Sequence, residues 1–396
     1  MKTLLPILAA LLLTAYASAS ASTATPAPTE TPASTAATLT LEQKVGQLFI
    51  VRPDALDLTL SQETIDDPRA DGVTQVTDAM RETLQQYPVG GICQFGKNIE
   101  SPSQLARFNK DLQAASATPL FITVDEEGGM VARLANNDAF DLPRYASAAA
   151  VGASGDPENA RAMGQTIGGY LKTYGFNMDF APDADVNTNP DNPIIGERAF
   201  SSDAATAAQM AAAAAEGLRQ NGILPTLKHF PGHGDTAEDS HTDLAVTYKT
   251  REELENCELL PFAADTGLHA VMVGHIAAPN VIGSDTPATL SAELIAMIPD
   301  TENTLIVTDS LSMDAITKAY TPGEAAIQAI QAGCDVLLMP NSLPEAYDAV
   351  LAAVQNGTIS EARLDQSVNK ILHYKQQFAV KGRGSAPPAS DAHYNV

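Results

Sequence analysis

Residues 304–309 read Thr-Leu-Ile-Val-Thr-Asp, a short apolar run that ends on a carboxylate. A run of this length, rich in apolar and β-branched residues, is typical of a parallel strand that is buried on both faces. Further runs of the same kind occur along the chain at residues 45–51, 89–95, 120–125, 178–186, 223–230, 270–276 and 335–339. Together these runs predict eight buried strands.

Longer stretches between the runs carry helix signals, such as Ser101-Pro102 ahead of residues 104–115, where proline suits the first helical turn. The other predicted helices span residues 74–86, 157–174, 203–220, 252–266, 291–298, 323–332, 344–355 and 360–378. Strands that alternate with helices predict an α/β fold, and eight such units predict a single domain built as a (β/α)8 TIM barrel. A doubly wound open sheet is the alternative, but the phosphate-binding patterns G-x-G-x-x-G and G-x-x-x-x-G-K-[ST] are both absent.

The barrel prediction places functional side chains at the carboxyl ends of the strands. Polar residues do end or follow five of the apolar runs, namely Asp125, Asp185 with Asn187, Lys228 with His229, His275, and Asp309. Asp309 is especially informative, because a carboxylate at the end of an almost purely apolar strand must be held by hydrogen bonds or used in chemistry.

The histidines of the chain concentrate after the fifth predicted strand. Three of the 7 His lie in residues 228–241, which read Lys-His-Phe-Pro-Gly-His-Gly-Asp-Thr-Ala-Glu-Asp-Ser-His. Gly232 and Gly234 would allow this segment to flex. The composition therefore predicts a catalytic loop that moves.

Two chemistries remain open from the residues of this loop alone. His229, His233 and His241 could bind a metal together with a carboxylate. Alternatively, Asp239 could orient His241 for metal-free acid–base catalysis, because the carboxylate would fix the tautomer and stabilise the charged ring. The spacing Asp239-Ser240-His241 favours the second chemistry, since an extended turn can bring residues two apart onto the same side.

Composition excludes some partners. The formal net charge is −25, so the chain repels nucleic acids and anionic membrane surfaces. Cys93, Cys257 and Cys334 form no C-x-x-C pair, which argues against a cysteine zinc site.

The two ends of the sequence differ from the rest. Residues 1–19 are expected to be a secretory signal peptide, because Lys2 precedes an apolar stretch and small residues follow it. That stretch is too short for stable membrane insertion. Residues 20–38, almost entirely Ala, Ser, Thr and Pro, predict a disordered linker, and residues 381–396 predict a disordered tail. Residues 39–380 would then form the folded domain of a secreted or cell-envelope protein.

Several long motifs resemble those of one enzyme family, the glycoside hydrolase family 3 β-N-acetylhexosaminidases. Residues 228–241 match the family signature K-H-F-P-G-H-G-D-T-x-x-D-S-H without a gap. The family patterns D-x-E-G-G-x-V-x-R, F-A-P-x-x-D-V-N, G-x-R-x-F and T-D-x-L-x-M appear at residues 125–133, 180–187, 196–200 and 308–313. The resemblance covers roughly residues 41–378, and it implies the branch of the family that carries its acid/base on a histidine loop within a single barrel.

The resemblance implies a role for each matching residue. Asp309 would attack the anomeric carbon and form a glycosyl-enzyme, while His241, with Asp239 as its partner, would protonate the leaving oxygen and then activate water. The residues implied to hold the terminal sugar are Asp125, Arg133, Arg198, Lys228 and His229. These roles leave no work for a metal or another cofactor, so none is expected.

The implied activity is the retaining hydrolysis of terminal non-reducing β-N-acetylglucosamine. Its substrates would be chitin-type oligosaccharides or cell-wall muropeptides, with a part in peptidoglycan turnover. A phosphorylase that uses the same site, with phosphate in place of water, is one alternative. A non-catalytic protein that binds cell-wall sugars is another, although the intact Asp239, His241 and Asp309 argue against it.

Overall fold

The computed structural model describes residues 35–238, 240 and 243–379. The predicted signal peptide, most of the predicted linker, the predicted tail, Asp239 and His241 lie outside the described residues. Throughout the described part, no helix combines the length and the apolar character needed to cross a membrane.

Every one of the predicted apolar runs contains a strand. These strands are β1 (Phe49–Val51), β2 (Gly91–Cys93), β3 (Phe121–Thr123), β6 (Met178–Asp179), β7 (Leu224–Phe230), β9 (Ala270–Val273), β11 (Leu305–Thr308) and β12 (Leu337–Leu338). The strands are buried along their whole length, as the apolar runs predict. Four short strands lie outside these runs or at their ends, namely β4 (Glu126–Gly128), β5 (Val131–Ala132), β8 (Ala245–Val246) and β10 (Ile276–Ala277).

The main strands form two parallel sheets, each of four strands. One has the order β12-β1-β2-β3 and the other β11-β9-β7-β6. In the first sheet Ile50 pairs with Gly91, and in the second Leu305 pairs with Ala270. The predicted α/β class with parallel strands is confirmed.

Main-chain hydrogen bonds also join the outer strands of the two sheets. Next to β3 and β6, Phe180 N–H donates to Val124 O at 2.9 Å. Next to β11 and β12, Thr308 N–H donates to Val336 O at 2.9 Å, and Val307 forms a parallel bridge with Val336. Main strands that are neighbours in space are therefore successive in the chain, except that the first, β1, pairs with the last, β12.

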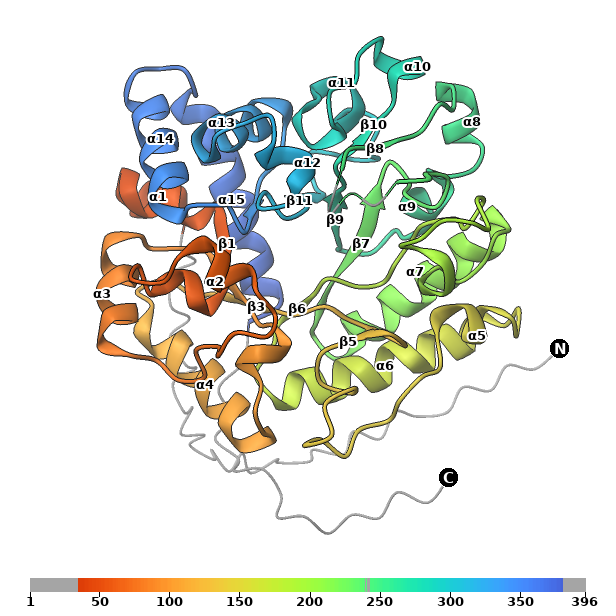
Figure 1. The fold of residues 1–396 in the computed structure, drawn as a ribbon, viewed down its shortest axis with the longest axis horizontal. Helices are drawn as coiled ribbons and strands as arrows, with labels where there is room; N and C mark the ends of the chain where they lie inside the picture. Colours follow the sequence, from red (N-terminus) through yellow and green to blue (C-terminus); the bar gives the residue numbers. More distant parts are fainter. Residues whose placement is uncertain (1–34, 239, 241–242, 380–396) are drawn as a thin grey trace, which may run out of the picture. The chain divides into compact units, whose positions relative to one another are not determined.

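Helices lie outside the strands, which occupy the centre of the view in Figure 1. The long helices are α3 (Asp78–Gln86), α4 (Pro102–Ala115), α6 (Pro157–Thr173), α7 (Ala204–Gln220), α13 (Pro322–Ala332), α14 (Leu343–Gln355) and α15 (Glu361–Gln377). The shorter ones are α1 (Leu41–Gln47), α2 (Gln62–Asp66), α5 (Ala148–Gly152), α8 (Arg251–Glu255), α9 (Leu260–Ala264), α10 (Pro279–Ile282), α11 (Ala292–Ile295) and α12 (Asp314–Thr317). Polar side chains begin most long helices, as where Ser101 Oγ accepts a hydrogen bond from Gln104 N–H.

Several element boundaries differ from the prediction, and three of the differences are informative. Residues 45–47, predicted as strand, belong to α1, because Thr40 and Gln43 form a capping box that starts a helix there. The single helix predicted over 252–266 is two helices, because Pro261 lacks an N–H and fits only near the start of the second one. Residues 36–38, assigned to the linker, form a turn of 3-10 helix in which Ala36 is buried.

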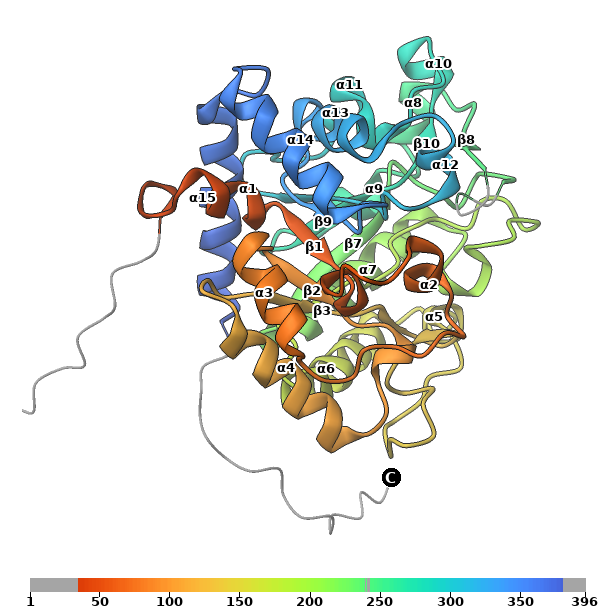
Figure 2. The ribbon, with the colours of Figure 1, turned by 60° about the vertical axis from the view of Figure 1, so that its left-hand side comes forward.

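The strand direction determines where side chains that follow the strands are placed. Figure 2 shows α2, α12 and the β8–β10 pair on one side of the strands, and α1 and α15 on the other. The parallel strands carry their carboxyl ends to the first of these sides. Side chains from distant parts of the sequence therefore meet there.

Candidate active site

The polar residues predicted at the strand ends do lie at the carboxyl ends of neighbouring strands. Asp125 follows β3, Asp185 follows β6, Lys228 and His229 lie near the end of β7, and Asp309 follows β11. Because β6, β7, β9 and β11 are adjacent and parallel, the ends of β6, β7 and β11 share one edge of their sheet. The end of β3, in the other sheet, is joined to β6 by the hydrogen bond from Phe180 N–H to Val124 O.

Lys228 is the buried cation at the centre of this edge. Its Nζ lies 2.8 Å from Asp125 Oδ1 and 2.6 Å from Glu127 Oε1, and only 3% of its side chain is exposed. Burial by itself would lower the pKa of Lys228, but the two carboxylates outweigh burial and hold that pKa above its ordinary value. Lys228 is therefore a permanent cation with a fixed ammonium group.

Arg198 is the second buried cation, and it comes from the 3-10 turn Gly196–Arg198. Its Nε and Nη2 each donate a hydrogen bond of 2.8 Å to the carboxylate of Glu127. Burial alone would raise the pKa of Glu127, but Arg198 and Lys228 together hold it well below its usual range. Glu127 thus remains an anion shared between two cations.

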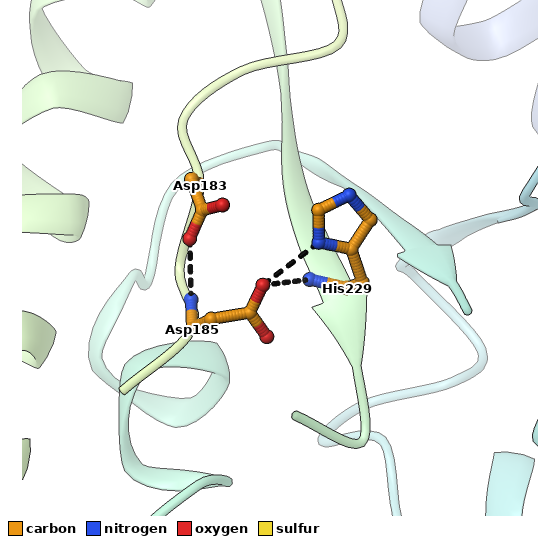
Figure 3. A group of neighbouring side chains, drawn as sticks. All are labelled: Asp183, Asp185 and His229. Carbon is orange, nitrogen blue, oxygen red and sulfur yellow. Dashed lines mark hydrogen bonds and ion pairs between the residues drawn. The ribbon is translucent and has the colours of Figure 1, made fainter. Parts of the chain in front are cut away.

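His229 is held by the carboxylate of Asp185. The Nδ1 atom of His229 lies 2.7 Å from Asp185 Oδ2, and its Nε2 atom lies 3.3 Å from Nη2 of Arg198. Arginine can only donate, so Nε2 of a neutral ring accepts from Arg198 and Nδ1–H donates to Asp185. Figure 3 shows the imidazole of His229 facing the Asp185 side chain.

Asp183, Asp185 and His229 form a compact group of potential metal ligands. Among the described residues, their donor atoms lie within 4.8 Å of one another (Figure 3). However, Nε of Arg198 lies 3.7 Å from Asp183 Oδ2, so a positive charge already occupies this neighbourhood. Burial and the adjacent Asp185 raise the pKa of Asp183 well above its ordinary value, which favours its protonated form. The donor set therefore fits a hydrogen-bond network better than a divalent metal.

Asp309 lies directly after β11 and is partly exposed. Its N–H donates to Val273 O at 2.9 Å, and its Oδ1 accepts from Ser310 N–H at 2.7 Å. The next residue is fixed as well, because Nε2 of the buried His275 lies 2.8 Å from Ser310 O. Asp309 is thus an oriented carboxylate on a rigid strand end.

Arg133 lies beside Asp125, at the border of the group of charged residues around Lys228. Its Nη2 is 3.9 Å from Asp125 Oδ2, and its guanidinium carbon lies 5.7 Å from the centre of the Phe95 ring. The side chain of Arg133 is 34% exposed, so it remains available to a ligand. Arg52 stacks on the same ring at 4.3 Å.

The two loop glycines, Gly232 and Gly234, lie in close contact with neighbouring atoms. A Cβ on Gly234 would lie 2.0 Å from Val186 O, and one on Gly232 would lie 2.5 Å from the Glu258 side chain. Glycine is required at these positions because neighbouring atoms approach the backbone closely. Close packing thus explains glycine at these two positions, and the expectation that they let the loop flex stays a prediction.

The structure brings four of the predicted substrate-binding residues into one hydrogen-bonded group and places Arg133 beside it. Asp309 lies on the same edge, while Asp239 and His241 are outside the described residues. The sequence reasoning missed Glu127, which pairs with both buried cations, and assigned no role to Asp183 and Asp185. All three lie inside the motifs at residues 125–133 and 180–187, so motif membership was the available signal.

Comparison with known proteins identifies the family. Residues 40–374 match the Glycosyl hydrolase family 3 N terminal domain. The chain belongs to glycosyl hydrolase family 3. The resemblance inferred from the motifs is confirmed.

Several members of glycosyl hydrolase family 3 are similar to this chain. Beta-hexosaminidase A of Pseudoalteromonas piscicida is 32% identical over 338 residues, a match that covers 77% of this chain and 56% of that protein. Beta-hexosaminidase LpqI of Mycobacterium tuberculosis is 33% identical over 323 residues, covering 77% of this chain and 80% of the relative. The chain thus spans little more than half the length of the first relative and most of the second.

A solved family 3 structure has the same arrangement of elements. The β-N-acetylglucosaminidase of Paenibacillus sp. str. FPU-7 superposes with a TM-score of 0.79 at 39% sequence identity. The match covers 89% of this chain and 65% of that chain.

Proposed function

We propose that this family 3 chain is a retaining β-N-acetylhexosaminidase that releases terminal non-reducing β-N-acetylglucosamine. The observation that carries the proposal is the buried group in which Lys228 binds Asp125 and Glu127 while Arg198 binds Glu127 and His229. Fixed charges of both signs suit a sugar, whose hydroxyls both donate and accept hydrogen bonds. The names of the relatives, two beta-hexosaminidases and a β-N-acetylglucosaminidase, support the choice of sugar.

The substrate-binding residues would divide into donors and acceptors. Arg198, Lys228 and Arg133 would donate to the hydroxyl and acetamido oxygens of the terminal sugar, and Asp125 would accept from its hydroxyls. His229 is already oriented by Asp185 and would complete the set. Because these side chains are already held in place before the sugar binds, they lose little conformational entropy when it does.

The chemistry would proceed in two steps. In the first, a carboxylate oxygen of Asp309 bonds to the anomeric carbon, the glycosidic C–O bond breaks, and His241 gives its proton to the leaving oxygen. In the second, His241 takes a proton from water, the water oxygen bonds to the anomeric carbon, and Asp309 is released. Asp239 would stabilise the charged His241 ring.

We propose that the two parallel sheets close into one (β/α)8 barrel. The hydrogen bonds beside β3 and β6 and beside β11 and β12 support closure, because they fall at the two seams that an open pair of sheets would leave unpaired. A closed barrel would place Asp125 and Asp309 at one mouth, where such enzymes bind their substrates.

We also propose that the protein is exported, with the mature chain starting between Ser18 and Ser22 and a linker leading to the domain. The proposal rests on the composition of residues 1–38, which suits a signal peptide and a linker. Cell-wall fragments or chitin-type oligosaccharides would then be the accessible substrates. N-terminal sequencing of the mature protein would test export, and a retained Met1 would contradict it.

Hydrolysis of nitrophenyl β-glycosides tests the function. We expect the N-acetylglucosamine glycoside to be cleaved with the highest kcat/KM when it is compared with the glucose and N-acetylgalactosamine glycosides. A preference for glucose, or no cleavage, would contradict the proposal. The same reactions with inorganic phosphate should yield free sugar, and release of sugar 1-phosphate would instead identify the phosphorylase.

A further inference from the structure

The guanidinium group of Arg133 is held differently from Lys228 and Arg198, the other two cations proposed to bind the sugar. Its Nη2 atom lies 3.9 Å from Asp125 Oδ2, a distance that suits an ion pair but is too long for a hydrogen bond. In the part of the chain that the structure describes, its buried Nε atom has no hydrogen-bond partner. The direction of this guanidinium before a sugar binds therefore depends largely on packing.

The main chain around Arg133 is fixed by the β4–β5 hairpin. Arg133 directly follows β5, and the carboxylate of Glu126 on β4 accepts hydrogen bonds from the next two N–H groups. These are Leu134 N–H at 2.9 Å and Ala135 N–H at 2.8 Å. Only the side chain of Arg133 thus remains to be oriented.

The ring of Phe95 contacts the guanidinium of Arg133 and that of a second arginine. The ring centre lies 5.7 Å from the guanidinium carbon of Arg133 and 4.3 Å from that of Arg52. At both distances a cation is attracted to the negative face of an aromatic ring. Phe95 is itself anchored, because its N–H donates to Oδ1 of the buried Asn98 at 3.1 Å.

Arg52, which directly follows β1, is held against this ring by partners from two other parts of the fold. From α2, Ile65 O accepts a hydrogen bond from its Nη1 at 2.8 Å, and Asp66 Oδ1 forms an ion pair with the same atom at 2.8 Å. After β12, the Sδ atom of Met339 accepts from its Nε at 3.3 Å. Because Asp66 compensates the charge of Arg52, a second cation can lie against the same ring of Phe95.

We propose that Phe95 and Arg52 are positioning residues for substrate binding, because the Phe95 ring, held by Arg52, orients the guanidinium of Arg133 toward the sugar. This inference rests on the proposed function, in which Arg133 donates to the terminal sugar. The side chain of Arg133 is 34% exposed, and its unpaired Nε–H is a donor that a ligand can satisfy. An arginine oriented in advance loses less conformational entropy when the sugar binds.

Three substitutions change this pair of positioning residues in different ways. Phe95→Leu keeps an apolar side chain at a partly buried position but removes the aromatic face. Arg52→Lys keeps a positive charge beside Asp66, but an ammonium group cannot stack on a ring as a planar guanidinium does. Phe95→Tyr keeps the aromatic face and should bind the sugar like the wild type.

The readout is the Kd of N-acetylglucosamine, measured by NMR titration in the presence and absence of Arg133. Phe95→Leu should raise the Kd about tenfold and Arg52→Lys several-fold, as expected when a cation–π contact is lost. In the Arg133→Met background neither substitution should raise the Kd further, because the group that they orient is gone. For the nitrophenyl N-acetylglucosaminide, KM should rise by the same factors while kcat stays nearly unchanged.

Phe378→Leu is the matched control. Phe378 is buried directly after α15, and its ring stacks on Tyr374 with the ring centres 6.5 Å apart. Figure 2 shows α15 on the side of the strands opposite to α2. The control should bind N-acetylglucosamine like the wild type even where its free energy of unfolding falls. The free energy of unfolding, measured for every variant, separates a lost contact at the site from a lost fold.

The coupling between substitutions decides the outcome. Increases of the Kd that add to that of Arg133→Met would overturn the proposal, and an unchanged Kd in Phe95→Leu or Arg52→Lys would overturn the role of the residue replaced. If Phe95→Leu does not fold, Arg52→Lys provides the test alone.

Failure of the inference is distinguishable from failure of the proposed function. If Arg133→Met weakens binding of N-acetylglucosamine while Phe95→Leu and Arg52→Lys do not, only the inference is wrong. If Arg133→Met binds the sugar as tightly as the wild type, the assignment of Arg133 to the sugar is wrong and the inference falls with it.

Discussion

Arg198 donates two parallel hydrogen bonds of 2.8 Å to the carboxylate of Glu127. Because Glu127 also lies 2.6 Å from Lys228 Nζ, one buried anion fixes two buried cations. A bidentate contact of this kind determines direction as well as distance. The orientation of the two cations proposed to bind the sugar thus depends on a residue that itself need not touch the sugar.

We predict that Glu127→Gln destabilises the protein and weakens binding of the sugar. The substitution keeps the shape but removes the charge that compensates Arg198 and Lys228, and breaking a buried ion pair costs about 3 to 5 kcal/mol. Urea unfolding measures the free energy of unfolding, and KM for the nitrophenyl N-acetylglucosaminide should rise in parallel.

Glu158→Gln is the matched control for this prediction. Glu158 pairs with Arg161 at 3.2 Å, but 70% of its side chain is exposed. Exposed pairs contribute at most about 1 kcal/mol, so the control should change neither stability nor KM noticeably. Equal changes of the free energy of unfolding and of KM in the two variants would contradict the prediction that Glu127 holds Arg198 and Lys228 in place.

Lys375 gives a prediction on stability and pH. It lies on α15, fully buried, with Nζ 2.7 Å from Gln47 Oε1 and 5.1 Å from the centre of the Phe121 ring. Burial lowers the pKa of Lys375 from 10.5 to about 7. Between pH 7 and 10.5 the unfolded chain therefore binds more protons at Lys375 than the folded protein does. The free energy of unfolding thus rises with pH across that window.

Replacing Lys375 with methionine should remove this dependence. Below pH 7 the folded protein carries the full cost of the buried charge, about 5 kcal/mol for a shift of this size. Lys375→Met should thus be more stable than the wild type at pH 6, and the gain should shrink toward pH 10. Thermal unfolding of both proteins at several pH values provides the measurement, and a gain that does not vary with pH would contradict it.

The strands could be predicted because their burial on both faces leaves a continuous apolar run. All eight runs contain strands, and residues 304–309 enclose β11. The prediction of a single helix over 252–266 was wrong, because its amphipathic pattern continues through Pro261. Proline lacks the N–H that a continuous helix needs there, so a second helix begins at this point. The apolar pattern thus predicts an element well where burial alone determines it, and less well where a single residue, such as a proline, ends the element.

The site was only partly predictable for a different reason. Asp125 and Lys228 were named because they end strands, but their contact joins residues 103 positions apart. Glu127 sits in the hairpin strand β4, where a charged residue is normally solvated, so its burial between two cations was invisible in the sequence. The pairing depends on how the β4–β5 hairpin folds over the strand ends, which no local signal describes.

Chelation should leave the activity nearly unchanged. The group of Asp183, Asp185 and His229 already has Arg198 beside it, and the proposed steps need no metal. Activity after dialysis against a strong chelator, compared with activity after added zinc, provides the measurement. A loss on chelation that zinc restores would show that these residues hold a catalytic metal.

The most direct test of the account is to trap the covalent intermediate on Asp309. A slow fluorinated β-N-acetylglucosaminide should leave the sugar bound to the enzyme, and mass spectrometry of proteolytic fragments should locate it on the peptide that contains Asp309. Asp309→Ala should not be labelled and should lose several orders of magnitude in turnover, because the covalent route is removed. Sugar attached to a different carboxylate, or unchanged labelling of Asp309→Ala, would contradict the assignment of Asp309 as the nucleophile.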